Sequence, residues 1–222
     1  MKGKPTVELL GPLNAVEQRF APPMLWTKGD KQLLARHPRV AVVGTRRPSP
    51  EGVRRTRRLV KELVKAGAVV VSGLAQGVDT VAHSQTLDLG GRTIAVLGTP
   101  IDEVFPKPNA NLQERIGDQH LLVSEFAPGS TVARGNFPRR NRTMALISDA
   151  SIIVEAGPTS GTISQGWEAL RLGRPLFLLK SLVDVGVPWP SEMIEHGALV
   201  LSSMDELLRV LPTDDIREAV AF

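Results

Sequence analysis

Arginines follow one of the short apolar segments of this chain at a point where an anion could bind. The apolar segment 39–44 ends in Gly44 and continues into Thr45, Arg46 and Arg47. Gly44 allows a tight turn, Thr45 can bind an anion, and the two guanidinium groups come where a phosphate would lie in an α/β protein. The Gly-x-Gly-x-x-Gly and Walker lysine motifs are absent, so neither a nicotinamide dinucleotide nor ATP hydrolysis is indicated.

The densest basic cluster lies further along, at Phe137-Pro138-Arg139-Arg140-Asn141-Arg142. Pro138 suits the first position of a helix, which would place the arginines in the first helical turn. Cations there oppose the helix dipole, so an anionic partner would account for them. The alternative is that they pair inside the protein, for instance with Glu125 or Glu155.

A serine, an aspartate and a histidine follow the second apolar segment. Asp79 and His83 are four residues apart and would share a helix face, with Ser72 nearby. A hydrolytic triad is one hypothesis, but Ser72 is not in a Gly-x-Ser-x-Gly elbow and the chain order differs from that of the hydrolases. In the structural alternative, Ser72 caps a helix, Gly73 and Gly77 permit close backbone approach, and His83 is a hydrogen-bonded structural residue.

A Gly/Ser/Thr-rich turn at 155–162 is a third possible anion site. It ends in Ser160, Gly161 and Thr162. Free backbone N–H groups in such a turn could hold a phosphate. The same composition also serves simply to cap a helix, so both interpretations stay open.

The elements that must position these residues follow from hydrophobic patterning. Short Val-, Ile- and Leu-rich segments predict strands buried on both faces, at 39–44, 68–72, 93–97, 120–124, 151–155, 175–179 and, as an edge strand, 198–201. Helical spacing lies between them, at 50–66, 76–89, 109–117, 138–148, 161–173, 189–196 and 204–211. This alternation predicts an α/β fold, a doubly wound, mostly parallel sheet of extended Rossmann-like type.

The domain organisation expected from this pattern has three parts. Prolines before residue 39 argue against regular structure there, apart from a short helix at 8–20, so 1–38 is expected to be an irregular extension. Residues 39–212 form the Rossmann-like core, and 213–222 form a tail.

Composition and charge limit the functions that this chain can have. Residues 1–65 hold fifteen Lys and Arg against five Asp and Glu, although the whole chain carries only +4. Such asymmetry suggests that one face meets a polyanion. With no cysteine and four scattered histidines, no metal site and no cofactor is expected. No apolar run is long enough for a membrane span and no secretory signal is present, so a cytoplasmic protein is expected.

The predicted helix at 50–66 is the most basic element, and its role stays open. It carries Arg54, Arg55, Arg57, Arg58, Lys61 and Lys65. Two i,i+4 pairs, Glu51 with Arg55 and Arg58 with Glu62, would neutralise part of it. The face could contact nucleic acid or only water.

Taken together, several stretches resemble the DNA-processing protein A family (DprA/Smf). They are LWTKGD (25–30), VAVVGTR (40–46), SGLAQGVDTVAH (72–83), TIAVLGT (93–99), FPKPN (105–109), SEF (124–126), FPRRNR (137–142) and EAGPTSGT (155–162). The resemblance implies a non-enzymatic, single-stranded DNA-binding protein of recombination and natural transformation, which dimerises and helps to load the RecA recombinase. At this length it suggests a member that has the core alone.

The resemblance also implies the residues of a DNA pocket. Carried over, they are Gly44, Thr45, Arg46, Ser72, Gly73, Arg140 and Arg142; the neighbouring candidates are Arg47, Phe137, Arg139, Asn141, Ser160, Gly161 and Thr162. Aromatic residues make up only 4% of the chain. Phosphate contacts are therefore expected to dominate, with Phe137 the one aromatic residue inside a basic cluster.

The competing hypothesis is a nucleotide-binding sensor, or a nucleoside-monophosphate phosphoribohydrolase, on the same fold. The resembled family is related in fold to the Lonely Guy phosphoribohydrolases, which use a Pro-Gly-Gly-x-Gly-Thr-x-x-Glu turn. Here Pro158–Thr162 is one residue short of that turn and lacks the double glycine, and Glu168 follows six residues after Thr162. Hydrolysis is thus the weaker hypothesis.

Overall fold

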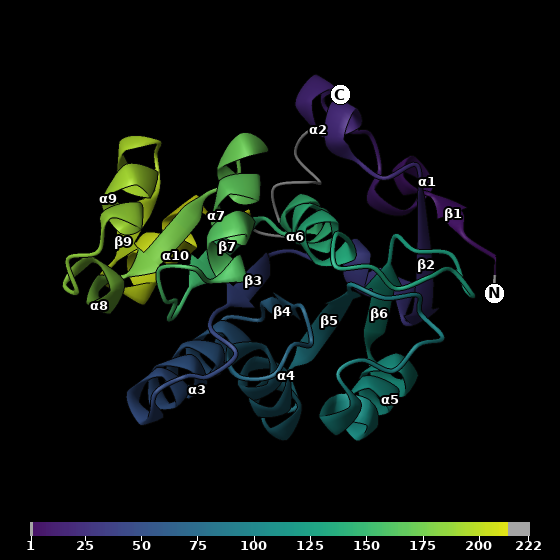
Figure 1. Ribbon diagram of the computed structural model, residues 1–222, viewed down its shortest axis with the longest axis horizontal. Helices are drawn as coiled ribbons and strands as arrows, with labels where there is room; N and C mark the ends of the chain where they lie inside the picture. The colour runs from purple at the N-terminus through teal and green to yellow at the C-terminus, as the bar shows by residue number, and fades with distance from the viewer. Residues whose placement is uncertain (1, 213–222) are drawn as a thin grey trace.

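A single sheet organises the molecule (Figure 1). The computed structural model describes residues 2–212, and over that range nine strands lie in the order β1-β2-β6-β5-β4-β3-β7-β8-β9. The strands are β1 (Lys4–Pro5), β2 (Met24–Gly29), β3 (Arg39–Val43), β4 (Val69–Ser72), β5 (Arg92–Leu97), β6 (Leu121–Ser124), β7 (Ala150–Ile153), β8 (Leu176–Leu179) and β9 (Leu199–Leu201).

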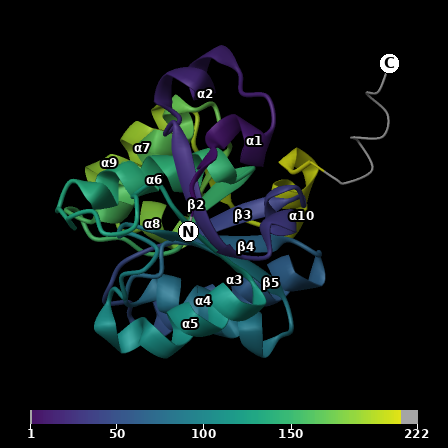
Figure 2. The same cartoon turned by 90° about the vertical axis from the view of Figure 1, so that its right-hand side faces the viewer.

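Helices cover both faces of this sheet (Figure 2). They are α1 (Thr6–Leu10), α2 (Ala15–Phe20), α3 (Pro50–Lys65), α4 (Val78–Asp88), α5 (Ala110–Gln119), α6 (Asn136–Ile147), α7 (Gly161–Arg171), α8 (Lys180–Val183), α9 (Pro188–Glu195) and α10 (Met204–Val210). The helices α3, α4 and α5 lie on one face, and α6, α7 and α9 on the other. Between residues 2 and 212, no helix has the length and apolarity needed to cross a membrane.

The predicted parallel sheet is confirmed. From β6 through β5, β4, β3, β7 and β8 to β9, every neighbouring pair is parallel. All seven predicted strands and all seven predicted helices are present, with boundaries shifted by a few residues. The strands read as continuous apolar segments because side chains on both of their faces are buried: Val40 and Val42 pack toward α3, and Ala41 and Val43 toward α6.

The N-terminal segment differs from the prediction. Residues 1–38 were expected to be irregular apart from one short helix, but they contain β1, α1, α2 and β2. Strand β2 pairs antiparallel with β6, and its Leu25 is buried in the core. The prediction failed because Pro22 and Pro23 precede this strand rather than interrupt it, so every residue of β2 keeps its backbone donor. The expected tail, 213–222, lies outside the described residues.

The strand order places a crevice at one edge of the sheet. After β3 the chain builds β4, β5 and β6 on one side, then returns to place β7, β8 and β9 on the other. Connections therefore leave β3 and β7 in opposite directions at their carboxyl ends. Open α/β sheets bind ligands at such a switch point.

Candidate functional site

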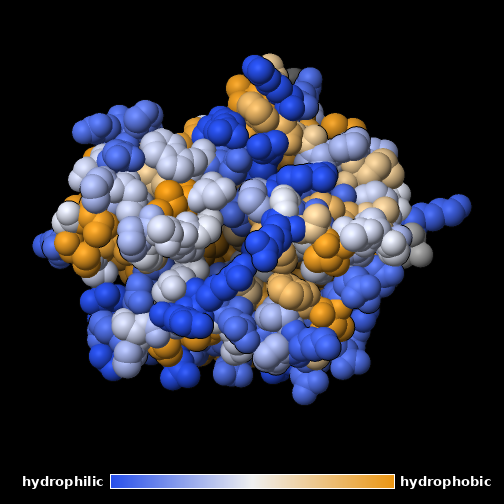
Figure 3. Space-filling view, viewed as in Figure 1, coloured by the Kyte–Doolittle hydropathy of each residue, from blue (hydrophilic) through white to orange (hydrophobic). Residues whose placement is uncertain are grey.

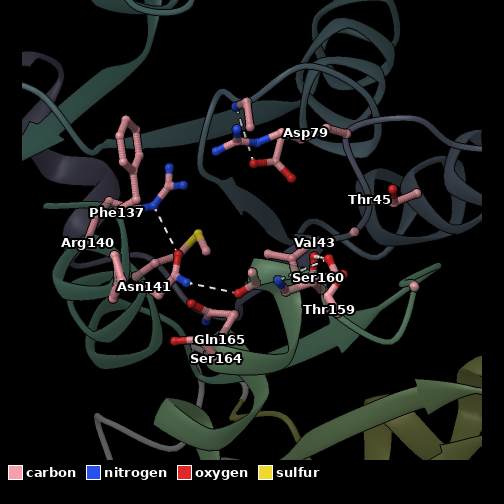
Figure 4. Close-up of a pocket in the computed structure, with 18 of the residues that line it drawn as sticks. Val43, Thr45, Asp79, Phe137, Arg140, Asn141, Thr159, Ser160, Ser164 and Gln165 are labelled. Carbon is pink, nitrogen blue, oxygen red and sulfur yellow. Dashed lines mark hydrogen bonds between the residues drawn. The ribbon is translucent and has the colours of Figure 1, made fainter. Parts of the chain in front are cut away.

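A cavity of about 530 Å³ opens at this switch point, between the carboxyl ends of β3 and β7. Figure 4 shows the start of α6 facing the loop after β3 across the cavity, with the turn before α7 completing the wall. Ten of the fourteen candidate residues line it: Gly44, Thr45, Arg46, Arg47, Phe137, Arg140, Asn141, Ser160, Gly161 and Thr162. Gly73 lines a smaller adjoining cavity, and Ser72, Arg139 and Arg142 line neither.

The loop after β3 is held tightly by its neighbours. The Thr45 backbone donates to Glu155 O at 2.7 Å, and Thr45 O accepts from Val78 N at 3.1 Å. Gly44 is required here, because a Cβ atom would press against Val78 and would lie 2.9 Å from Glu155 O. This packing fixes the loop backbone and leaves the side chains of Arg46 and Arg47 exposed.

The N-terminus of α3, next to this loop, is already occupied by a carboxylate. Glu155 accepts from the Ser49 backbone at 2.9 Å and from the Ser49 hydroxyl at 2.7 Å. Ser49 in turn caps the helix by accepting from Gly52 N at 2.9 Å. Glu155, expected as an alternative partner for the α6 arginines, thus serves as an anchor for the loop. An anion in the cavity must be bound by other donors, chiefly the exposed arginines.

Aromatic rings lie beside the exposed Arg46. Its guanidinium carbon is 5.9 Å from the centroid of the Phe137 ring. The Phe137 ring in turn lies 5.4 Å from that of Phe105, tilted by 46°. Phe105 is 43% exposed and lines the smaller cavity of about 90 Å³ together with Phe137 and Arg46. Aromatic faces beside a guanidinium suit a stacked base with its phosphate.

Arg140 is a buried residue, in contrast to Arg46. Its side chain donates to the carbonyl oxygens of Gly73 and Val96, the latter at 2.9 Å, and to Asn141 Oδ1 at 3.2 Å. Burial lowers the pKa of Arg140, although nearby Asp79 favours its charge. Gly73 is needed for this contact, since a Cβ there would clash with the guanidinium. Arg140 therefore joins α6 to the ends of β4 and β5 and presents at most part of its guanidinium to the cavity.

Arg139 and Arg142 pair with acids of the protein. Arg139 lies 3.4 Å from Glu125, and Arg142 donates to Glu168 at 2.9 and 3.3 Å. The hydrogen bond to Glu168 raises the pKa of Arg142. The intramolecular alternative considered for this cluster therefore holds for these two arginines, with Glu168 taking the place proposed for Glu155.

The start of α6 also differs from the prediction. The helix begins at Asn136, so Pro138 is its third residue and not its first. Proline is tolerated there because backbone N–H groups of the first turn have no partner within the helix. The arginines consequently lie beyond the first turn, where the helix dipole argument for an anionic partner carries little weight.

The proposed hydrolytic trio is not assembled. The Ser72 hydroxyl donates to Val42 O at 2.7 Å. His83 contacts Thr93 Oγ1 at 2.7 Å, and because the Thr93 hydroxyl donates to Val70 O, the histidine must be the donor. Burial lowers the pKa of His83 to about 3, so it is neutral at physiological pH. The structural alternative is confirmed for His83, but Ser72 bonds to a carbonyl of β3 and does not cap a helix.

Asp79 is bound to backbone groups at the same place. Its Oδ2 accepts from Gly73 N at 3.2 Å and from Ala75 N at 3.3 Å. Burial raises the pKa of Asp79, an effect that the charge of Arg140 and these two bonds oppose. Asp79 thus holds the turn after β4 and balances the buried Arg140.

The turn before α7 has the form expected of a helix cap. The Ser160 hydroxyl accepts from Thr162 N at 3.2 Å, and Asn141 Nδ2 donates to Gly161 O at 3.2 Å. Glu168, the acid considered for phosphoribohydrolase chemistry, is buried and bound by both Arg142 and Arg171. It does not line the cavity.

Several lining residues are absent from the candidates chosen from sequence, among them Phe105 and Gln165. Phe105 lies in the FPKPN stretch, which was noted only for its resemblance, and Gln165 lies one helical turn into α7. Neither belongs to a charged or Gly-rich motif, so only the fold brings them to the cavity. In the part of the chain that is described, no group of three or more His, Asp or Glu side chains could hold a metal ion.

Comparison with known proteins shows which family and which proteins this chain is similar to. Residues 12–212 match the family model described as DNA recombination-mediator protein A. Protein Smf of Synechocystis is 41% identical over 194 residues, covering 86% of this chain and 49% of the relative, so the chain spans about half of that relative's length.

Two solved structures are similar over most of the chain. DNA processing protein A from Streptococcus pneumoniae has a TM-score of 0.81 at 34% identity, covering 94% of this chain and 73% of that one. DNA processing protein A from Helicobacter pylori, described for its single-stranded DNA binding mode, has a TM-score of 0.77 at 30% identity, covering 94% and 93%.

Proposed function

Because this chain belongs to the DNA recombination-mediator protein A family, we propose that it binds single-stranded DNA in the cavity between β3 and β7. The protein then acts as a DNA-processing factor in recombination or natural transformation, as a binder and not as a catalyst. The observation that carries the proposal is the pairing of the exposed Arg46 with the Phe137 ring at the rim of this cavity.

The rim supplies what a single strand requires. Arg46 and Arg47 offer guanidinium groups to phosphates, and the ring pair Phe105–Phe137 offers a face to an unpaired base. The Gly44 backbone and the turn at 157–162 shape the cavity wall between them. In duplex DNA the bases are stacked inside the helix and their faces are not available to the rings, so the site favours single strands.

The family resemblance adds partners and a compartment to the proposal. A second copy of this chain and the RecA recombinase are the protein partners, and the cytoplasm is the compartment. Sedimentation equilibrium tests the dimer: a mass twice that of the chain supports it, and a monomer at all concentrations contradicts it. Co-purification of RecA on DNA-bound protein tests the second partner.

A nucleotide-binding sensor is the second candidate, because the same cavity could hold a mononucleotide. Phosphoribohydrolase activity is disfavoured, since the Glu168 carboxylate is bound by two arginines. Incubation with a nucleoside monophosphate and assay for free base distinguishes the enzyme from the binder: released base would contradict the non-catalytic proposal.

The test of DNA binding is fluorescence anisotropy with labelled oligo-dT and the matching duplex, repeated across salt concentrations. We expect tighter binding to the single strand and a log–log salt slope of about −0.7 for each phosphate contact. Failure to bind oligo-dT at low salt would overturn the proposal. A mononucleotide that competes as well as the oligonucleotide would favour the sensor.

A further inference from the structure

The basic face of α3 is the largest charged feature that the cavity does not use. Its exposed cations are Arg54, Arg57, Arg58, Lys61 and Lys65. Their spacing of i, i+3, i+4, i+7 and i+11 places them on one side of the helix. The opposite side is buried against the sheet and includes Leu59 and Leu63. We call these five cations the α3 stripe.

Most of the stripe is not neutralised by the protein. Glu51 bonds to Arg54 at 2.9 Å and lies 3.5 Å from Arg55, so the expected Glu51–Arg55 pair is present. The other expected pair, Arg58 with Glu62, is not among the ion pairs of residues 2–212. Arg57, Lys61 and Lys65 likewise form no ion pair within that range.

The stripe is continuous with the DNA cavity along the chain. Arg46 and Arg47 lie in the loop that leads directly into α3, and the helix then runs from the carboxyl edge of the sheet toward its opposite edge, where β4 begins. Figure 3 shows strongly hydrophilic residues at the lower left of this face, where Figure 1 draws α3. A strand held by Arg46 therefore has a cationic path beside it.

We infer that single-stranded DNA leaving the cavity runs along the α3 stripe, which binds its phosphates. The inference rests on the proposed function of the cavity. With 16 residues, α3 is about 24 Å long, enough for roughly three phosphates even at twice the spacing of one strand of B-DNA. The five cations lie within about a third of the helix circumference, with the acids Glu51 and Glu62 along one side of them, so the stripe fits one phosphate backbone and not the two of a duplex.

The contacts must come from side chains alone. The N-terminus of α3 is occupied by Ser49 and Glu155, so its backbone donors do not compete for phosphate. Arg57, Lys61 and Lys65 are long flexible cations, which bind phosphates without reading sequence. The stripe would therefore extend the length of strand bound and raise the salt dependence, without adding base preference.

The test is a length-dependent salt titration of the full chain. The stripe variant carries Arg57→Gln, Lys61→Gln and Lys65→Gln. The control variant carries Lys31→Gln, Arg92→Gln and Arg115→Gln, which remove the same charge from exposed positions outside both the cavity and the stripe. Both are compared with the parent protein on oligo-dT of about 6 and about 20 nucleotides, one below and one beyond the extent of a single site. Thermal melting checks that both variants are folded.

On the longer strand, the stripe variant should lose about 2 from the magnitude of the salt slope, since three contacts are removed at about 0.7 each. On the shorter strand it should match the control. Equal slopes for the stripe variant and the parent protein on the longer strand would overturn the inference, as would an equal loss in the control. An Arg46→Ala variant separates the two proposals: if it binds both strands like the parent, the cavity assignment fails, whatever the stripe does.

Discussion

Two arginine-rich segments reach the same cavity, but the arginines of one are exposed and those of the other are buried or paired with acids. In the loop after β3, Arg46 and Arg47 are exposed and free of ion pairs within the described part of the chain. At the start of α6, Arg140 is buried, and Arg139 and Arg142 pair with acids. Arginine density alone therefore does not show which guanidinium groups are available to a phosphate; that depends on whether the fold supplies acids and carbonyls to the same groups.

The largest expected effect lies in the buried segment. Arg140→Ala should lower the free energy of unfolding by about 3 kcal/mol or more, because the carbonyls of Gly73 and Val96 lose their donor and Asp79 loses its neighbouring charge. Arg46→Ala should cost no more than about 0.5 kcal/mol, as expected of an exposed residue. Urea denaturation measures both. Equal stability of the two variants would remove the distinction between the segments.

Gly73→Ala tests the same contact from the other side. The new methyl group would occupy the position of the Arg140 guanidinium, so we expect a loss of about 1–3 kcal/mol from overpacking. In the double variant with Arg140→Ala, the clash is relieved, so the two losses should not add. Strict additivity in a double-mutant cycle would contradict a direct contact.

Acid sensitivity tests the burial of His83 between α4 and the sheet. The pKa of His83 falls from 6.5 to about 3 because of burial, and the charge of Arg140 adds to the effect. As the pH drops below 6.5, His83 is protonated in the unfolded chain but stays neutral in the folded chain. The free energy of unfolding therefore decreases on acidification from pH 6.5 toward pH 3. At pH 5 this amounts to about 2 kcal/mol.

The variant His83→Asn isolates that contribution. Asparagine keeps a donor for Thr93 Oγ1 and does not titrate, so the variant should lose less stability between pH 7 and pH 5 than the parent, by about 2 kcal/mol. Urea denaturation at the two pH values gives the difference. The same pH dependence in both proteins would mean that His83 is protonated in the folded state.

The smallest effect is expected at the paired arginine of α6. Arg142→Gln breaks the ion pair with Glu168. Because the Arg142 side chain is one-third exposed, the free energy of unfolding should fall by no more than about 1 kcal/mol. Oligo-dT affinity should change less than about twofold, since Arg142 does not line the cavity. A large loss of DNA affinity would show that the paired segment binds phosphate after all.

The sequence was sufficient for most of the fold. Strands buried on both faces, such as β3 and β7, and the amphipathic α3 have periodicities that depend on local residues alone. The strand β2 was missed because its partner, β6, is almost a hundred residues away, and the nearby prolines suggested irregular structure. The position of Pro138 was misjudged because helix boundaries depend on the first turn, where proline at several positions is compatible.

The site was only half predictable. Gly44 and Arg46 could be found because glycine and arginine after a buried strand mark a ligand edge in this fold class. The pairing of Arg142 with Glu168, and the use of Glu155 to hold Ser49, depend on tertiary contacts between distant segments. Phe105 reaches Phe137 for the same reason. Residue type indicated where charge is dense, and only the packing shows which charges are free.

One measurement addresses the central claim directly: the affinity of Arg46→Ala and Arg142→Gln for labelled oligo-dT, across salt, with stability checked for both. Arg46→Ala should bind roughly tenfold more weakly and lose about 0.7 from the magnitude of the salt slope, while Arg142→Gln stays close to the parent protein. Parent-like binding by Arg46→Ala together with a large loss in Arg142→Gln would contradict the assignment of the exposed loop as the DNA site.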